Sequence, residues 1–172
     1  MKAKMCVLVV GVLIALALKQ HYATARADDL LWILAPTAQL AGVITAASFT
    51  LQPGEGYLSR ERLFLIEKSC AGINFMICAF AMLVCAWIHR VGSAASAARV
   101  LSVSLGASYA AAVAVNAMRI AVALWLGAHP AALPMTSARD LHRVEGVLVY
   151  FGGLVLLYEM ATRLDRRAEM VR

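Results

Sequence analysis

The amino-acid sequence predicts an all-α integral membrane protein, a helical bundle of about four to five transmembrane helices with a short external β-hairpin before the third of the apolar stretches. Of the 172 residues, 62% are hydrophobic and only 15% are charged, which is too apolar for a soluble domain of this size. The net charge of +6 does not indicate nucleic-acid binding, because the basic residues are scattered between apolar runs. We treat residues 1–172 as a single membrane-embedded domain.

Five apolar stretches are candidates for membrane helices. They cover residues 5–18, 30–51, 71–88, 100–126 and 144–161. Basic residues favour the cytoplasmic side of a membrane, which places both termini and the loop of residues 90–99 inside. Only an even number of spans puts both termini on one side. We therefore expect that one of the five stretches does not cross the membrane.

The stretch 30–51 is the one that we expect not to cross, because Pro36, Thr37 and Gln39 interrupt it. It would then be an interfacial or re-entrant helix. An ordinary span with a kink at Pro36 remains the alternative. The first stretch follows Lys2 and Lys4 and resembles a signal peptide, but we expect an uncleaved first span.

Residues 52–69 read QPGEGYLSRERLFLIEKS and differ from the rest of the chain. Turn residues at Pro53, Gly54 and Gly56 are followed by polar and apolar residues mixed at short range. This pattern predicts a small external β-hairpin that leads into the third apolar stretch.

Three residues capable of chemistry lie at similar distances from the basic ends of the last three spans. From Cys70 to His89 is 19 residues, from Arg99 to Arg119 is 20, and from His142 to Arg163 is 21. At about 1.5 Å per residue each interval is roughly 30 Å, the hydrocarbon thickness of a bilayer. We therefore expect Cys70, Arg119 and His142 to lie at one depth, near the outer face.

These three residue types together form a coherent site for nucleophilic catalysis. A thiol is mostly protonated at neutral pH, so a cysteine that transfers acyl groups needs a nearby base or cation. His142 can serve as the base, and the forked cation of Arg119 can pair with a thiolate or with the oxyanion of a tetrahedral intermediate. Asn116 lies one turn before Arg119 and could orient it or supply a second donor.

Each candidate also has a structural interpretation. Cys70 could be a small buried hydrophobic residue, as we expect for Cys78 and Cys85 in the same apolar run. Arg119 could be a snorkelling arginine at a helix end. His129 is a rival base to His142.

Two further assignments concern the supporting groups. Asp140 could orient an imidazole or only cap the last helix, and Glu145 is a similar case. The four cysteines lack a CxxC pair, so we expect no structural metal site, and nothing in the sequence indicates a cofactor.

Three segments resemble the motif regions of the exosortase and archaeosortase family. They are EKSCAGINF at 67–75, NAMRI at 116–120 and HRVEG at 142–146, in the family's order of Cys, Arg and His. The short chain and ILAPTAQL at 33–40 look most like the small exosortase K type. Larger members have additional spans or domains that this chain lacks.

The resemblance implies a membrane cysteine protease or transpeptidase in the bacterial inner membrane, with its active site facing the periplasm or outside. Its partners would be exported proteins ending in a short motif, a hydrophobic helix and a basic tail, cleaved through a thioester. It implies that Cys70 is the nucleophile, Arg119 the electrostatic partner and His142 the acid/base, with Asn116 matching the family's asparagine. The alternative is a non-enzymatic membrane module that binds lipid phosphate or a partner helix through Arg119.

Overall fold

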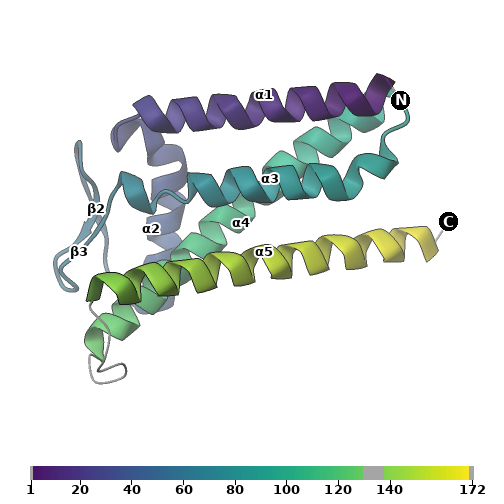
Figure 1. Cartoon of the computed structure of the whole chain (residues 1–172). Helices are drawn as coiled ribbons and strands as arrows, with labels where there is room; N and C mark the ends of the chain where they lie inside the picture. Colours follow the sequence, from purple (N-terminus) through teal and green to yellow (C-terminus); the bar gives the residue numbers. More distant parts are fainter. Residues whose placement is uncertain (1, 130–137, 171–172) are drawn as a thin grey trace. The chain divides into compact units, whose positions relative to one another are not determined.

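The computed structural model describes residues 2–129 and 138–170, without the side chains of residues 138–143 and 168–169 (Figure 1). Five α-helices dominate it and confirm the predicted all-α class: α1 Lys2–Thr24, α2 Leu31–Thr45, α3 Ile73–Trp87, α4 Ala94–Ala128 and α5 Ala138–Met170. Three short 3₁₀ helices accompany them: η1 Asp28–Leu30, η2 Lys68–Cys70 and η3 Ile88–Arg90.

Four helical segments in the described part of the chain are long and apolar enough to cross a membrane. They are Lys2–Thr24, Lys68–Arg90, Ala94–Ala128 and Val144–Arg167. Helix α2 is not among them, because its 15 residues span only about 22 Å at the α-helical rise. The count of four is even, as the distribution of basic residues requires, and the length of α2 favours an interfacial or re-entrant helix.

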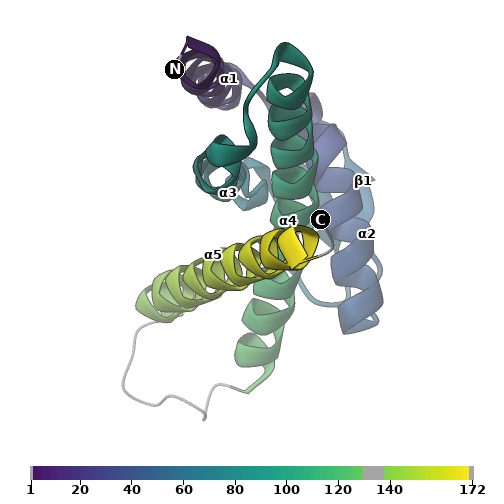
Figure 2. The same cartoon turned by 90° about the vertical axis from the view of Figure 1, so that its right-hand side faces the viewer.

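The chain forms two compact units. The first contains residues 1–24, 73–112 and 153–172, and therefore α1, α3, the first part of α4 and the last part of α5. Helices α1 and α3 lie side by side in both views (Figure 2). Their shared core is a cluster of apolar side chains: Val7, Phe80, Val84, Val91 and Val100.

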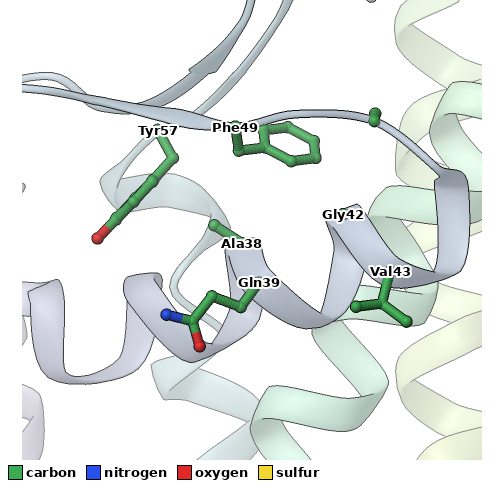
Figure 3. Close-up of a pocket in the computed structure, with 7 residues that line it drawn as sticks. Ala38, Gln39, Gly42, Val43, Phe49 and Tyr57 are labelled. Carbon is green, nitrogen blue, oxygen red and sulfur yellow. The ribbon is translucent and has the colours of Figure 1, made fainter.

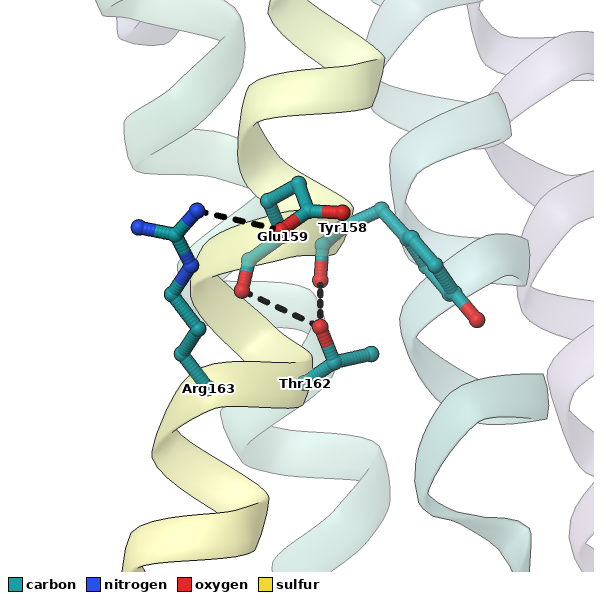
Figure 4. Close-up of polar contacts among 4 residues, drawn as sticks. All are labelled: Tyr158, Glu159, Thr162 and Arg163. Carbon is teal, nitrogen blue, oxygen red and sulfur yellow. Dashed lines mark hydrogen bonds and ion pairs between the residues drawn. The ribbon is translucent and has the colours of Figure 1, made fainter.

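The basic ends of α3 and α5 meet within this first unit. Asp165 of α5 pairs with Arg90, and its Oδ2 lies 3.1 Å from Nε2 of His89. Within α5 itself, Arg163 Nη2 lies 3.3 Å from Glu159 Oε2 (Figure 4). The contacts of Asp165 with His89 and Arg90 put charged groups from two spans at one level.

The second unit contains residues 25–72 and 113–152. It includes an antiparallel sheet of three strands in the order β1-β2-β3: β1 Thr50–Gln52, β2 Gly56–Ser59 and β3 Phe64–Ile66. The register pairs Leu51 with Tyr57, and Leu58 with Leu65. The sheet therefore has one strand more than the predicted hairpin, and β1 begins inside the stretch 30–51.

The early end of α2 explains this difference. Ala46 adopts a left-handed conformation with φ of 50°, and the N–H of Ala47 donates to the carbonyl of Gly42 at 3.2 Å. A Cβ at Gly42 would lie only 2.9 Å from the Ala47 oxygen, so this turn needs glycine there. The helix thus ends at Thr45 although the apolar sequence continues.

Polar contacts tie the sheet to the segment that precedes α2. The Asp28 carboxylate accepts a hydrogen bond from the N–H of Gly54 at 2.9 Å, at the β1–β2 turn. After β3, Lys68 donates through Nζ to the carbonyl of Ala25 at 2.7 Å. The second contact fixes the turn that carries Cys70.

Candidate active site around Cys70

Cys70 lies at a sharp strand-to-helix turn in the second unit. It ends η2, four residues after β3 and three residues before α3. Its N–H donates to the carbonyl of Glu67 at 2.8 Å, and its Sγ lies 3.8 Å from the hydroxyl of Ser69. Gly72 has a φ of +69°, a conformation that side chains other than glycine rarely adopt. The chain can therefore turn into α3 directly after Cys70.

The cysteines differ in burial in a way that we did not predict. Cys70 is only 7% exposed, whereas Cys78 and Cys85 are exposed on α3. The prediction that Cys78 and Cys85 are buried was wrong. Their positions belong to the outward side of an apolar helix, where a small thiol can face hydrocarbon.

Asn116 connects α4 to the main chain of Cys70. It is completely buried, and its Nδ2 donates a hydrogen bond to the carbonyl oxygen of Cys70. Gly72 lies next to this side chain, and a Cβ at Gly72 would be in ordinary contact with it, 3.4 Å from Cβ and Cγ of Asn116. A buried amide in the middle of an apolar helix is costly unless it is paired, so this contact is specific.

Arg119 follows one turn later on α4 and points toward α5 within the same unit. Its Nη1 donates to the hydroxyl of Tyr150 at 3.4 Å, and its Cζ lies 5.4 Å from the centre of the Tyr150 ring. The Tyr150 hydroxyl donates in turn to Oδ1 of Asn116 at 2.9 Å. These contacts direct the guanidinium toward α5.

Helix α5 provides two further neighbours of Arg119. Glu145 is 6% exposed and lies near Arg119. Gly146 lies against the guanidinium, since a Cβ there would be 3.0 Å from Nε of Arg119. Cys70, Arg119 and Glu145 all lie near the Tyr150 hydroxyl. The second unit therefore gathers a thiol, a cation, a carboxyl group and a phenol.

Tyr150 is the member of this cluster that sequence analysis missed. The available signal was its spacing, because Tyr150 follows Gly146 by four residues and so lies on the same face of α5 as the HRVEG segment. A tyrosine in an apolar span is more often a packing or interfacial residue, so spacing alone does not select it.

The two proposed acid/base residues of α5 lie partly outside the described structure. The backbone of Asp140 and His142 belongs to α5, but their side chains are outside the described residues. The rival, His129, is exposed at the end of α4. Its ring stacks on Trp125 with centroids 4.9 Å apart, and its Nδ1 donates to the Trp125 carbonyl at 2.8 Å.

A cavity of about 380 Å³ lies elsewhere in the second unit, between α2 and the sheet (Figure 3). Its lining is mostly apolar: Ala38, Gln39, Gly42, Val43, Ala47, Phe49 and Tyr57. None of these residues is a member of the cluster around Cys70. The cavity therefore contributes no group to the chemistry of Cys70.

The described residues contain no group of three or more His, Cys, Asp or Glu side chains placed to hold a metal ion. The chain matches no protein-family model, no curated protein and no solved structure. Any function of the cluster must therefore follow from its residues and their geometry.

Proposed function

We propose that this protein is a membrane cysteine protease or transpeptidase that cleaves C-terminal sorting signals of exported proteins through a thioester intermediate. The observation that carries the proposal is the Asn116 side chain, which binds the Cys70 carbonyl at one end and Tyr150, the partner of Arg119, at the other. A thiol and a permanent cation from separate helices are thereby held in one small region. A cysteine acyl-transfer site can use such a pair, with the thiol as nucleophile and the cation as the group that stabilises developing negative charge.

The reaction begins at Cys70. Its thiolate attacks the carbonyl carbon of the scissile peptide bond, and the electron pair moves onto the carbonyl oxygen. The start of α3 three residues later favours negative charge near the sulfur. Arg119 supplies a fixed positive charge that stabilises the thiolate first and the oxyanion afterwards.

The intermediate then collapses to a thioester. The C–N bond breaks, and His142 gives the leaving amine the proton that it took from the Cys70 thiol. An acceptor, which is water or an amine or lipid nucleophile, attacks the thioester and releases Cys70 again as the thiol. His142 precedes Glu145 by three residues on α5, and this spacing puts the two positions on one side of the helix. Asp140 lies two residues before His142 in α5, and residues two apart in a helix do not face each other, so we assign it no part in the reaction.

The proposed substrates follow from the membrane setting. Four apolar helices are compatible with a multi-pass membrane protein, and the basic residues favour a cytoplasmic side for both termini. In this topology Cys70 faces the outside of the bacterial inner membrane. An exported protein held by a hydrophobic C-terminal helix and a basic tail would present the segment before that helix at the same level.

The experiment is co-expression with an exported protein from the same genome that ends in a short motif, an apolar helix and arginines. The parent should shorten this protein, and Cys70→Ala should stop the processing. Cys78→Ala, on the outward side of α3, is the matched control and should process normally. Normal processing by Cys70→Ala would contradict the proposal and favour a non-enzymatic module that uses Arg119 to bind lipid phosphate or a partner helix.

A further inference from the structure

The side chain of Tyr150 does more than pack its aromatic ring, because its hydroxyl group makes two hydrogen bonds. Its hydroxyl donates to Oδ1 of Asn116 at 2.9 Å and accepts from Nη1 of Arg119 at 3.4 Å. Both partners come from α4, one turn apart, whereas Tyr150 comes from α5. One hydroxyl group therefore connects two helices at the point where the cation lies.

The hydroxyl also fixes the orientation of the Asn116 amide. An amide has an oxygen that only accepts and a nitrogen that only donates. Because Tyr150 donates to the oxygen, the nitrogen is turned toward the Cys70 carbonyl, which it binds. Asn116 is completely buried, so no solvent is available to replace either partner. The position of the Cys70 main chain thus depends on the Tyr150 hydroxyl.

We infer that Tyr150 is a positioning residue, which holds the guanidinium of Arg119 and the main chain of Cys70 in one arrangement through its hydroxyl group. The inference rests on the proposed function, because it assigns to Arg119 the stabilisation of the Cys70 thiolate. Tyr150 acts through Arg119 and Asn116, the two side chains that its hydroxyl binds.

The reactivity of Cys70 reports on this arrangement without any substrate. Tyr150→Phe keeps the ring and its contact with the guanidinium and removes only the hydroxyl group. Arg119 then loses one hydrogen bond, which is worth roughly a twofold to tenfold change in an equilibrium or rate. Alkylation of Cys70 at pH 7 should slow by about that factor, and the whole rate profile should move to higher pH.

The experiment measures alkylation by iodoacetamide against pH in membranes, in a chain whose Cys6, Cys78 and Cys85 are replaced by serine. Tyr150→Phe is compared with Arg119→Gln and with the double variant. The matched control is Tyr158→Phe, which removes a hydroxyl from the same helix at a residue that is 47% exposed (Figure 4). If the structure around Cys70 only loosens, the plateau of the alkylation rate at high pH should change. If Arg119 loses its position, the pH midpoint of the alkylation profile should move.

We expect Tyr150→Phe and Arg119→Gln to move the midpoint upward and Tyr158→Phe to leave it in place. The double variant should be no slower than Arg119→Gln alone, because both changes act on one cation. An unchanged midpoint in Tyr150→Phe beside a shift in Arg119→Gln would overturn the role of Tyr150 and leave the cysteine enzyme intact. The role of Tyr150 would also be overturned if Tyr150→Phe moved the midpoint of Cys70 alkylation equally in the parent chain and in the Arg119→Gln variant.

A second variant covers the case in which Tyr150→Phe does not fold. Trifluorotyrosine at position 150 keeps the size and the hydroxyl group but ionises at lower pH. Once ionised, it no longer donates to Asn116, so the alkylation profile of Cys70 should gain an additional inflection. A profile identical to that of the parent would count against the positioning role. If Arg119→Gln has no effect on Cys70 and Cys70→Ala still processes substrate, the proposed function fails as well.

Discussion

Replacing Gly146 by alanine should reduce activity while strengthening the helix. The added Cβ would lie 3.0 Å from Nε of Arg119 and 3.7 Å from its Cζ and Nη2, whereas ordinary contacts begin at 3.4 Å. The guanidinium must therefore move by a few tenths of an ångström. Its bond to the Tyr150 hydroxyl is already 3.4 Å long, near the limit for a hydrogen bond, so this movement should break it.

The expected magnitudes have opposite signs for stability and for activity. Alanine is favoured over glycine inside a helix by about 1 kcal/mol, so the melting temperature should stay equal or rise. A misplacement of about 1 Å at a catalytic group can cost roughly a hundredfold in rate, so a shift of a few tenths of that distance should cost about fourfold to sixfold. Processing of the co-expressed substrate in membranes and thermal unfolding in detergent measure the two effects separately.

Gly152→Ala is the control for this prediction. Gly152 lies in the same helix, and nothing is within 4 Å of the position that its Cβ would take. It should gain the same helical preference and keep full activity. Gly146→Ala with parental activity would show that the position of Arg119 does not limit the reaction, and an equal loss in Gly152→Ala would show that the effect belongs to the helix and not to the cation.

Three further predictions concern other contacts. Arg119→Lys keeps the charge but loses the forked donor, so the protein should still fold while most processing of the substrate is lost. Near-parental processing would show that the guanidinium group is not needed for the reaction. Gly72→Ala forces a φ of +69° onto alanine next to Asn116, so the melting temperature should fall and Cys70 alkylation should change; an unaltered protein would contradict the need for glycine in the turn after Cys70. Hydrogen bonds from the Ser48 hydroxyl and N–H lower the pKa of the Glu61 carboxyl group. Their contribution to the stability of the fold is therefore fully present above the ordinary carboxyl pKa of 4.5, and it is lost as the pH falls through the lower pKa of the folded state. Ser48→Ala should lower the melting temperature at pH 7 more than at pH 3, and equal losses at both would refute this assignment.

The sequence was sufficient to predict the helices because a bilayer imposes a length on every span. Basic residues at the ends of the apolar runs predicted which ends lie together on the cytoplasmic side. In the structure, the contact of His89 and Arg90 with Asp165 joins two of these ends. The same spacing placed Cys70 and Arg119 at one depth. The structure has both in one unit, connected through Asn116.

Other features could not be predicted, because they depend on contacts between distant residues. The end of α2 at Thr45 requires the close approach of Ala47 to Gly42, and an apolar pattern does not contain that information. Tyr150 has no distinctive sequence context, and its importance follows only from the Asn116 and Arg119 groups that face it. The exposure of Cys78 could not be predicted either. Both faces of α3 are apolar, so the periodicity of the sequence does not distinguish a side that faces lipid from a side that faces protein.

If Cys70 is the nucleophile of an acyl-transfer reaction, capture of the acyl-enzyme tests its role most directly. Membranes containing the protein and its co-expressed substrate are quenched during processing, and the Cys70 peptide is analysed by mass spectrometry with and without neutral hydroxylamine. We expect a substrate-derived adduct on Cys70 that hydroxylamine removes, and none on Cys78 or Cys85. Processing that proceeds with no adduct on Cys70, or with a hydroxylamine-sensitive adduct on another cysteine, would contradict this role.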